Sequence, residues 1–436
     1  MALLVSNQVK NEELLSKRSR VNRNPDFLSK NYLKIGLNKY DSITNSQGYI
    51  NLGIAENRLC EDIWIKKITE ISRSPNFVSP DLLYYYQFHG TPELTETMSR
   101  FIETRFGSIE QIQQDKLVFM DGVAAILNGL AMTLADPGDV FLCPTPVFTR
   151  IRNYFLDVGG VDIYPVPMFD VSSSDDPFRM RIDILESYLQ KAKKDGLNVR
   201  GLLLINPNNP TGKVYTSTEL QQIMIFCKRE SLHVIFDEIY ALSTQGQGGF
   251  NSVLSMDILD PKRTHFVWGL SKDLGLSGFR CGVVYSQDIE IVNRLKQVAL
   301  FQAVPSPTQK LINGILSDSA WIDSVYFPAY YNKAKAMHTL VKEVLDELNI
   351  PTPCSGSNAI FIWMDLSKFL KEPSKEEEIK LFNRFMEAGL FIIPGMEMFS
   401  QFPGWFRLTY TLPEQEIREG LRRFRKVLMQ GRNLSD

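Results

Sequence analysis

The sequence contains few of the residues that build disulfide networks or metal sites. Only five cysteines and four histidines occur among its 436 residues. The cysteines are odd in number and lack paired spacing, at Cys60, Cys143, Cys227, Cys281 and Cys354. The histidines are equally isolated, at His89, His233, His265 and His338. We therefore expect reduced thiols rather than a disulfide framework, and no bound metal.

The sequence also lacks an excess of charge of one sign and a long apolar run. Its net charge is -2 and its isoelectric point is about 6.2, so nothing indicates attraction to nucleic acid or to an anionic membrane. The longest apolar candidate, residues 117–134, is interrupted by Asp121 and Asn128. The first residues carry Asn, Lys and Glu too early for a signal peptide. We expect a cytoplasmic protein that binds neither nucleic acid nor membrane.

What the sequence does contain is a series of short, continuous apolar runs. They alternate with helical patterns such as residues 217–230, where Leu220, Ile223 and Cys227 share one face. Continuous runs are typical of strands that are covered on both faces. The runs occupy residues 117–121, 140–144, 161–166, 201–207, 233–237, 264–270 and 281–285. This alternation predicts an α/β fold with a mainly parallel, seven-stranded sheet flanked by helices.

The C-terminal part of the chain follows a different pattern. Long helical patterns at residues 331–348, 376–387 and 413–429 surround one short strand at 359–365. We therefore expect three parts in order along the chain: an N-terminal arm that packs on the small domain, a large domain, and a smaller α+β domain. Their predicted ranges are 1–48, 49–305 and 306–436. The basic residues within 17–23 are expected to form a solvated face rather than a targeting signal.

Polar residues follow several of the predicted strands, at the edge where such sheets bind ligands. Alone, each has an ordinary explanation. Residues 206–212 are rich in turn formers, Asp237 is a possible helix cap, and Lys272 and Arg280 are compatible with solvated surface positions. Together they provide what a pyridoxal phosphate enzyme requires. These requirements are an amine for the aldehyde, a carboxylate for the pyridine nitrogen, an anion cradle and an arginine for the substrate carboxylate.

Four segments resemble those of the fold type I pyridoxal phosphate enzymes of the class I and II aminotransferase family. They are N-P-N-N-P-T-G at 206–212, D-E-I-Y at 237–240, S-K-D-L-G-L-S-G-F-R at 271–280 and P-G-W-F-R at 403–407. Two further segments, L-G-I-A-E-N-R-L-C at 52–60 and A-D-P-G-D at 135–139, are similar to the 1-aminocyclopropane-1-carboxylate synthases and to synthase-like proteins of animals and fungi. The resemblance begins near residue 48 and extends to the C-terminus. It implies a large domain that binds pyridoxal 5′-phosphate.

The resemblance also implies roles for the strand-end residues. Lys272 would form the imine with the cofactor and move protons at the substrate α-carbon. Asp237 would pair with the pyridine nitrogen, and Tyr240 and Asn209 would donate to the ring oxygen. Of these, Lys272, Tyr240 and Asp237 are the predicted catalytic residues.

The remaining implied contacts surround the cofactor. Phe148 would stack on the ring. The backbone amides of Val123 and Ala124, the Ser271 hydroxyl and the Arg280 guanidinium would hold the phosphate.

The substrate contacts are implied in the same way. Arg407 would grip the substrate α-carboxylate, with Asn209 beside it. Glu56 lies in the segment near the substrate. Phe88 would reach a neighbouring subunit's site, so the resemblance implies a homodimer with shared active sites.

Three positions depart from the plant synthases. Their Tyr-His-Gly segment is Phe88-His89-Gly90 here, so one active-site hydroxyl is missing. The serine expected two residues before Ser271 is Gly269, and the stacking tyrosine is Phe148. Compensation for Phe88 by residues 84–86, all tyrosine, is a further hypothesis.

These departures leave several functions open. The shared first steps are imine exchange with an α-amino acid and loss of its α-proton. We expect transamination or elimination at the β or γ carbon, as in a lyase. The first alternative is a true 1-aminocyclopropane-1-carboxylate synthase acting on S-adenosylmethionine. The second is a non-catalytic scaffold that binds the cofactor. The identity of the amino acid does not follow from any motif.

Overall fold

The computed structural model describes residues 27–85, 87–170, 173, 176–244, 249–354 and 358–432. The basic residues at 17–23 and Tyr86, both considered above, lie outside the described residues. Within the described ranges, none of the helices combines the length and apolar character that a bilayer-spanning segment needs.

A seven-stranded sheet forms the centre of what we call the large lobe. Its strand order is β2-β8-β7-β6-β5-β3-β4, and all neighbours are parallel except β8, which runs antiparallel to β2 and β7. The strands are β2 (Leu117–Met120), β3 (Val140–Thr145), β4 (Asp162–Pro167), β5 (Val199–Ile205), β6 (His233–Asp237), β7 (Thr264–Gly269) and β8 (Gly282–Ser286). The prediction of a mainly parallel, seven-stranded sheet is confirmed.

Helices cover both faces of this sheet, which explains why the strands are apolar throughout. Along β5, Leu202 and Leu204 pack into one hydrophobic cluster while Leu203 and Ile205 pack into another. The second cluster contains α6 (Gly122–Leu134), α7 (Arg150–Gly159) and α11 (Ile289–Ala299). The first cluster contains α5 (Pro92–Phe106), α8 (Ile182–Lys194), α9 (Ser217–Arg229) and α12 (Ser306–Leu316).

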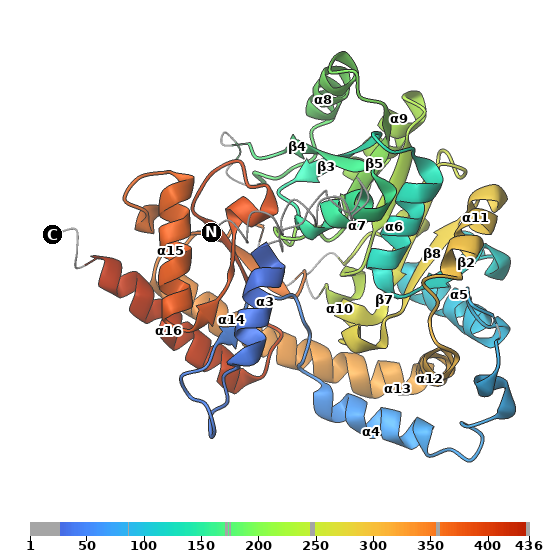
Figure 1. The fold of residues 1–436 in the computed structure, drawn as a ribbon, viewed down its shortest axis with the longest axis horizontal. Helices are drawn as coiled ribbons and strands as arrows, with labels where there is room; N and C mark the ends of the chain where they lie inside the picture. Colours follow the sequence, from blue (N-terminus) through green and yellow to red (C-terminus); the bar gives the residue numbers. More distant parts are fainter. Residues whose placement is uncertain are drawn as a thin grey trace, which may run out of the picture.

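A second, smaller sheet forms what we call the small lobe. Its antiparallel order is β11-β12-β9, from β11 (Ile393–Pro394), β12 (Trp405–Thr409) and β9 (Phe361–Asp365). Helices α15 (Lys375–Glu387) and α16 (Glu414–Arg432) lie with it on one side of the molecule, in orange and red in Figure 1. Helix α14 (Phe327–Glu347) runs from the large lobe to this side (Figure 1).

The first described segment packs on the small lobe. The Phe27 ring of α3 (Phe27–Leu37) lies 4.9 Å from the Phe382 ring of α15. The strand β1 (Ile50–Asn51) pairs in parallel with β10 (Leu390–Phe391). The Arg423 guanidinium donates to the Gly48 carbonyl at 2.7 Å. The division of the chain at residues 48 and 305 stays a prediction, and α12 beyond that second boundary contacts α4 (Glu61–Ser72) and α5 of the large-lobe side.

Short helical turns make most of the remaining connections. They are η1 (Pro80–Leu83), η2 (Gln114–Lys116), η3 (Ala241–Ser243), η4 (Val253–Ser255), α10 (Leu270–Asp273), η5 (Ser277–Phe279), α13 (Ser319–Trp321), the π-helical turn η6 (Ile322–Tyr326), η7 (Ser367–Phe369) and η8 (Gly395–Met398). Two of them, η3 and α10, follow β6 and β7 at the carboxyl edge of the sheet. They carry residues that the sequence singled out.

Candidate active site

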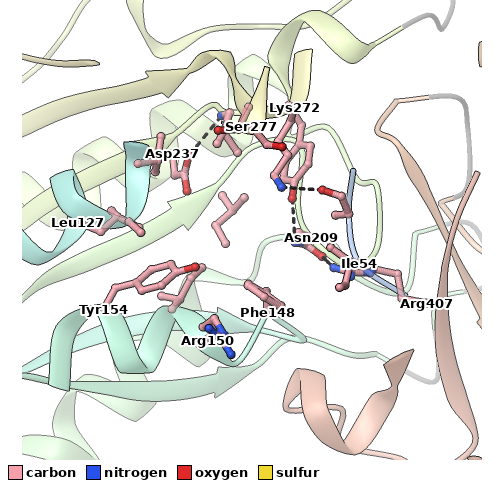
Figure 2. A pocket seen from close by; sticks show the side chains of 18 of the residues that line it. Ile54, Leu127, Phe148, Arg150, Tyr154, Asn209, Asp237, Lys272, Ser277 and Arg407 are labelled. Atoms are coloured by element: carbon pink, nitrogen blue, oxygen red, sulfur yellow. Dashed lines mark hydrogen bonds between the residues drawn. The ribbon is translucent and has the colours of Figure 1, made fainter. Parts of the chain in front are cut away.

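A cavity of about 560 Å³ lies at the carboxyl edge of the large sheet, where α6 begins. Figure 2 shows it from close by, with Lys272, Asp237, Asn209 and Arg407 arranged around it. Of the twelve site residues predicted from the sequence, the cavity brings ten together. They are Val123, Ala124, Phe148, Asn209, Asp237, Tyr240, Ser271, Lys272, Arg280 and Arg407.

Lys272 lies in the short turn α10, directly after β7. Its Nζ donates to the Ala55 carbonyl at 2.6 Å. Removal from bulk water lowers the pKa of this amine to about 8, although the Glu56 charge opposes the shift. A lysine with a lowered pKa has a larger neutral fraction at neutral pH, and the neutral amine is the nucleophile.

Asp237 ends β6 and is almost completely buried, with 4% of its surface exposed. Among the described residues, its carboxylate accepts one hydrogen bond, from the Ile239 backbone N–H at 3.3 Å. Burial raises its pKa to about 7, and the Ile239 N–H and the Lys272 charge counteract part of that rise. A buried carboxylate with so little local compensation is suited to an N–H donor from a ligand.

Arg407 is a cation buried beside the cavity, 1% exposed. Its guanidinium donates to Asn209 Oδ1 at 2.7 Å and to the Gly53 carbonyl, and Asn209 in turn donates to the Tyr240 hydroxyl at 3.0 Å. Its Nε has no hydrogen-bond partner within the part of the chain that the structure describes. Desolvation lowers the pKa of Arg407 to about 10. Among the ion pairs between described residues, none involves Arg407, so a carboxylate ligand would complete its environment.

One loop accepts hydrogen bonds from both Arg407 and Lys272. Residues 53–57 supply the Gly53 carbonyl to Arg407 and the Ala55 carbonyl to Lys272. From the same loop, the Asn57 side-chain amide donates to the Lys272 carbonyl at 3.0 Å. This contact explains why a segment far away in the sequence belongs to the site.

An anion cradle forms where α6 begins. Gly122 has φ +78, and a Cβ added there would lie 2.6 Å from Arg280 Nη2. Arg280 pairs with Asp121 at 3.1 Å and leaves its half-exposed guanidinium beside the first α6 amides. A helix N-terminus next to a guanidinium favours a phosphate group, because both present N–H donors and positive potential.

Two predicted residues lie outside the lining of this cavity. Glu56 does not line it but acts on Lys272 through its charge. Phe88 lies in a second hollow, which we call the Phe88 hollow, with Tyr84, Tyr85 and Pro305. The implied action of Phe88 in a neighbouring subunit stays a prediction.

Several lining residues were missed by the sequence reasoning. Ser277 lies at the cradle, and its hydroxyl in S-G-F-R was a usable signal. Arg150 and Tyr154, four residues apart on α7, both line the cavity, and this helical spacing was a weaker signal. The α3 residues Ser29, Tyr32 and Leu33 had no signal, because the small lobe places their helix.

The close neighbours of Gly269 explain why this position has a glycine in place of the expected serine. A Cβ added at this position would lie 3.0 Å from both the Cys281 carbonyl and Val123 Cγ2. Glycine therefore allows β7 and β8 to approach the start of α6 closely, and a serine would require these neighbours to shift.

The cavity fits the cofactor that the resemblance implies. Lys272 offers the amine, Asp237 an under-compensated carboxylate for the ring nitrogen, and Tyr240 a hydroxyl for the ring oxygen. The α6 start and Arg280 offer the phosphate cradle. When bound, pyridoxal 5′-phosphate supplies an electron-accepting ring. Among the described residues, no group of three or more acidic, histidine or cysteine side chains is placed to bind a metal ion.

Comparison with known proteins gives a family. The sequence profile of "Aminotransferase class I and II" matches residues 47–424. The chain is 35% identical over 415 residues to the Bos taurus 1-aminocyclopropane-1-carboxylate synthase-like protein 1, covering 94% of this chain and 82% of that protein. It is 34% identical over 396 residues to the Homo sapiens protein named probable inactive 1-aminocyclopropane-1-carboxylate synthase-like protein 2, covering 90% and 69% of the two chains.

A solved structure shares the fold. A Thermus thermophilus aspartate aminotransferase, studied as a single mutant, superimposes with a TM-score of 0.78 at 20% identity. The match covers 95% of this chain and 99% of that chain. The chain belongs to the class I and II aminotransferase family, in its 1-aminocyclopropane-1-carboxylate synthase-like group, and its cofactor is pyridoxal 5′-phosphate.

Proposed function

We propose that the protein is an active enzyme that breaks a bond at the α-carbon of an amino acid, by transamination or by elimination at the β or γ carbon. The observation that supports this most directly is the joint presence in one cavity of Arg407, a buried cation without a carboxylate partner among the described residues, and Lys272, an amine with a lowered pKa. Burial of an unpaired cation is expensive unless a ligand compensates it.

In this proposal, each residue of the cavity has a separate role. Arg407 binds the substrate α-carboxylate, and its position between the Phe148 and Phe361 rings, 5.7 and 5.1 Å from their centroids, fixes the plane of the guanidinium. Asn209 joins this guanidinium to the Tyr240 hydroxyl, so the carboxylate site and the ring-oxygen site move together. Lys272 accepts the α-proton and returns it, because its amine is neutral in an appreciable fraction near neutral pH.

Cyclopropane formation from S-adenosylmethionine is the first alternative. Phe148 lines the cavity with an aromatic face and no hydroxyl. Phe88 likewise has no hydroxyl to offer a neighbouring site. Both positions reduce the polar contacts for a sulfonium substrate, so we place this reaction second.

A scaffold without catalysis is the other alternative, and one relative is named probable inactive. The hydrogen-bond chain from Arg407 through Asn209 to Tyr240 supports an enzyme over a scaffold. Without a substrate to bind, burial of Arg407 would bring only the desolvation penalty.

The deciding experiment measures the shared step and then the branch. Holoenzyme is incubated in deuterium oxide with a panel of amino acids, and incorporation of deuterium at the α-carbon is followed by mass spectrometry. Products are then identified with S-adenosylmethionine, with cysteine conjugates, and with each amino acid with and without a keto-acid acceptor. Transamination requires the acceptor, whereas elimination yields a keto acid and ammonia without it.

Lys272→Ala is the control and should abolish exchange. If no amino acid exchanges its α-proton with the wild-type holoenzyme, the scaffold alternative holds instead.

We also propose a homodimer with shared active sites. Large apolar side chains are exposed here: Tyr84 at 70% and Tyr85 at 93% line the Phe88 hollow, and Phe301 at 84% lies two residues before its lining residue Ala303. Exposed aromatic clusters of this kind mark protein interfaces. The next residue, Gln302, accepts a hydrogen bond from the Asp121 backbone N–H at 2.8 Å, so the patch borders the anion cradle. A second copy seated here would lie beside the cofactor site.

A further inference from the structure

Asp273 follows Lys272 directly and is completely buried at 0% exposure. It does not line the cavity. Its carboxylate accepts three hydrogen bonds: from Trp268 Nε1 at 2.9 Å, from the Leu242 backbone N–H at 3.0 Å and from the Ser243 hydroxyl at 2.7 Å. This buried acid is therefore saturated with protein donors and is unlike Asp237, which has one.

These donors come from the turn η3 and from the end of β7. Leu242 and Ser243 lie in η3, directly after Tyr240, and Trp268 lies in β7, directly before the α10 turn. The register of β6 with β7 ends at the pair Asp237 and Val267. Beyond that pair, the Asp273 carboxylate provides the connection between the turn that carries Lys272 and the turn that carries Tyr240.

The backbone of the same turn is held from outside as well. The Tyr326 hydroxyl donates to the Asp273 carbonyl at 2.7 Å, and Asn57 donates to the Lys272 carbonyl at 3.0 Å. A helix of four residues such as α10 has too few internal hydrogen bonds to fix its own orientation. Contacts from its neighbours must therefore determine where the lysine side chain begins.

We propose that Asp273 is a positioning residue, which fixes the turn of Lys272 against the turn of Tyr240 and so places the amine at the cofactor. It does not touch substrate or reacting atoms. The effect of Asp273 on the bound cofactor depends only on the family assignment. The effect of Asp273 on turnover rests on the proposed function.

The matched variants are Asp273→Ala and Asp273→Asn. Alanine removes all three hydrogen bonds. Asparagine preserves the shape and can still satisfy the donors, because its carbonyl can face Trp268 and Leu242 while its amide N–H faces the Ser243 hydroxyl. Rescue by asparagine therefore separates positioning from any effect of the negative charge.

The primary readout is the absorption band of the holoenzyme, titrated with pH in the absence of substrate. We expect Asp273→Ala to move the midpoint by about one pH unit, a tenfold change in the proton equilibrium. Asp273→Asn should stay close to wild type. With an active substrate, alanine should lower kcat by about tenfold or more with KM nearly unchanged, since Arg407 remains in place.

Ser243→Ala is a second test in case Asp273→Ala does not fold. It removes one of the three hydrogen bonds to Asp273 by changing the donor, and it should shift the midpoint in the same direction by a smaller amount. Asp139→Asn is the control for loss of a buried acid at the opposite edge of the sheet. That acid accepts from Asn198 and from the Asp136 backbone N–H, both at 2.9 Å, and its replacement should leave the band unchanged.

Several outcomes overturn the inference. The inference is wrong if the midpoint of the absorption band is unchanged in both Asp273→Ala and Ser243→Ala. It is also wrong if the midpoint in Asp273→Asn shifts as far as in Asp273→Ala. Failure of the proposed function is seen separately, because it would leave the wild-type band intact and abolish α-proton exchange.

Discussion

At the scale of single residues, the cavity contains charged groups that have lost much of their solvent. Burial lowers the pKa of Lys272 to about 8 and of Arg407 to about 10, and raises that of Asp237 to about 7. Each shift favours the neutral form, so each group gains from a ligand of complementary charge or hydrogen-bonding character. These three residues, all predicted from the sequence, are thus charged groups that the fold leaves under-compensated.

Arg407→Lys tests the substrate contact. Lysine keeps the charge but loses the planar fork and its contacts with the Phe148 and Phe361 rings. We expect KM for an amino-acid substrate to rise by about 10- to 100-fold, as for loss of a charge-assisted pair. The absorption band of the bound cofactor should stay unchanged. Arg152→Lys, which alters an exposed arginine paired with Asp162 at 2.6 Å, is the control and should leave KM unchanged.

A histidine pair away from the cavity predicts a pH-dependent stability. His233 Nδ1 lies 3.1 Å from His265 Nε2, and His265 Nδ1 lies 3.0 Å from the Ser286 hydroxyl. Burial lowers the pKa of His233 to about 4 and that of His265 to about 3, from 6.5. The charged groups that act on His233 are Arg200, Arg263, Asp260 and Asp288.

The direction of the effect follows from these values. Because both folded pKa values lie below the unfolded one, the unfolded chain binds more protons, and stability falls as pH drops from about 6.5 towards 4. His233 alone accounts for at most about 3 kcal/mol of this loss. Urea unfolding at several pH values should show a shallower loss for His265→Gln than for wild type. Parallel curves for the two proteins would contradict the assignment.

At the scale of elements, the start of α6 has a steric demand that bears directly on the anion cradle. Gly122→Ala places a Cβ 2.6 Å from Arg280 Nη2 in a backbone with φ +78. We expect about tenfold or greater loss of cofactor affinity, measured by titrating the apoprotein with pyridoxal phosphate and following absorbance.

Gly138→Ala is the matched control for Gly122→Ala. It has the same kind of backbone, with φ +97, but nothing lies within 4 Å of the added Cβ. Both variants should lose about 1 kcal/mol of stability, and the control should keep its cofactor affinity. Equal affinities in the two variants would show that the clash with Arg280 has no effect on the cradle.

Elements were predictable where their signal is local. Each apolar run predicted as a strand overlaps one of the seven strands, with ends that differ by at most two residues, since a strand covered on both faces needs apolar side chains at every position. The same reasoning locates Asp237 and Lys272, because strand ends are visible in sequence. The position of α3 against the cavity was not predictable, since it depends on packing between Phe27 and Phe382, which are far apart in the chain. Tyr154 was missed because a tyrosine on an amphipathic helix has no distinctive pattern.

At the scale of the whole molecule, the exposed patch around the Phe88 hollow predicts assembly. Wild-type protein should give twice the 49.8 kDa chain mass in light scattering. Tyr85→Asp together with Phe301→Asp should give the single-chain mass and reduce turnover, because charges in an apolar interface must be desolvated.

The control for this assembly test is Ile43→Asp, which alters a side chain 91% exposed outside the patch. It should leave the mass at two chains. A wild-type monomer that still turns over substrate would remove both the dimer and the shared site.

The pairing of Ile50 with Leu390 has a mechanical consequence. It attaches the chain between α3 and the loop at 53–57 to the same body that contains Arg407. The α3 side chains that line the cavity and the Arg407 guanidinium of β12 are thus both attached to the small lobe. Any tilt of the small lobe away from the large sheet would therefore move the α3 wall of the cavity and the Arg407 side chain in a single step, so the volume of the cavity and the position of its buried cation would change together.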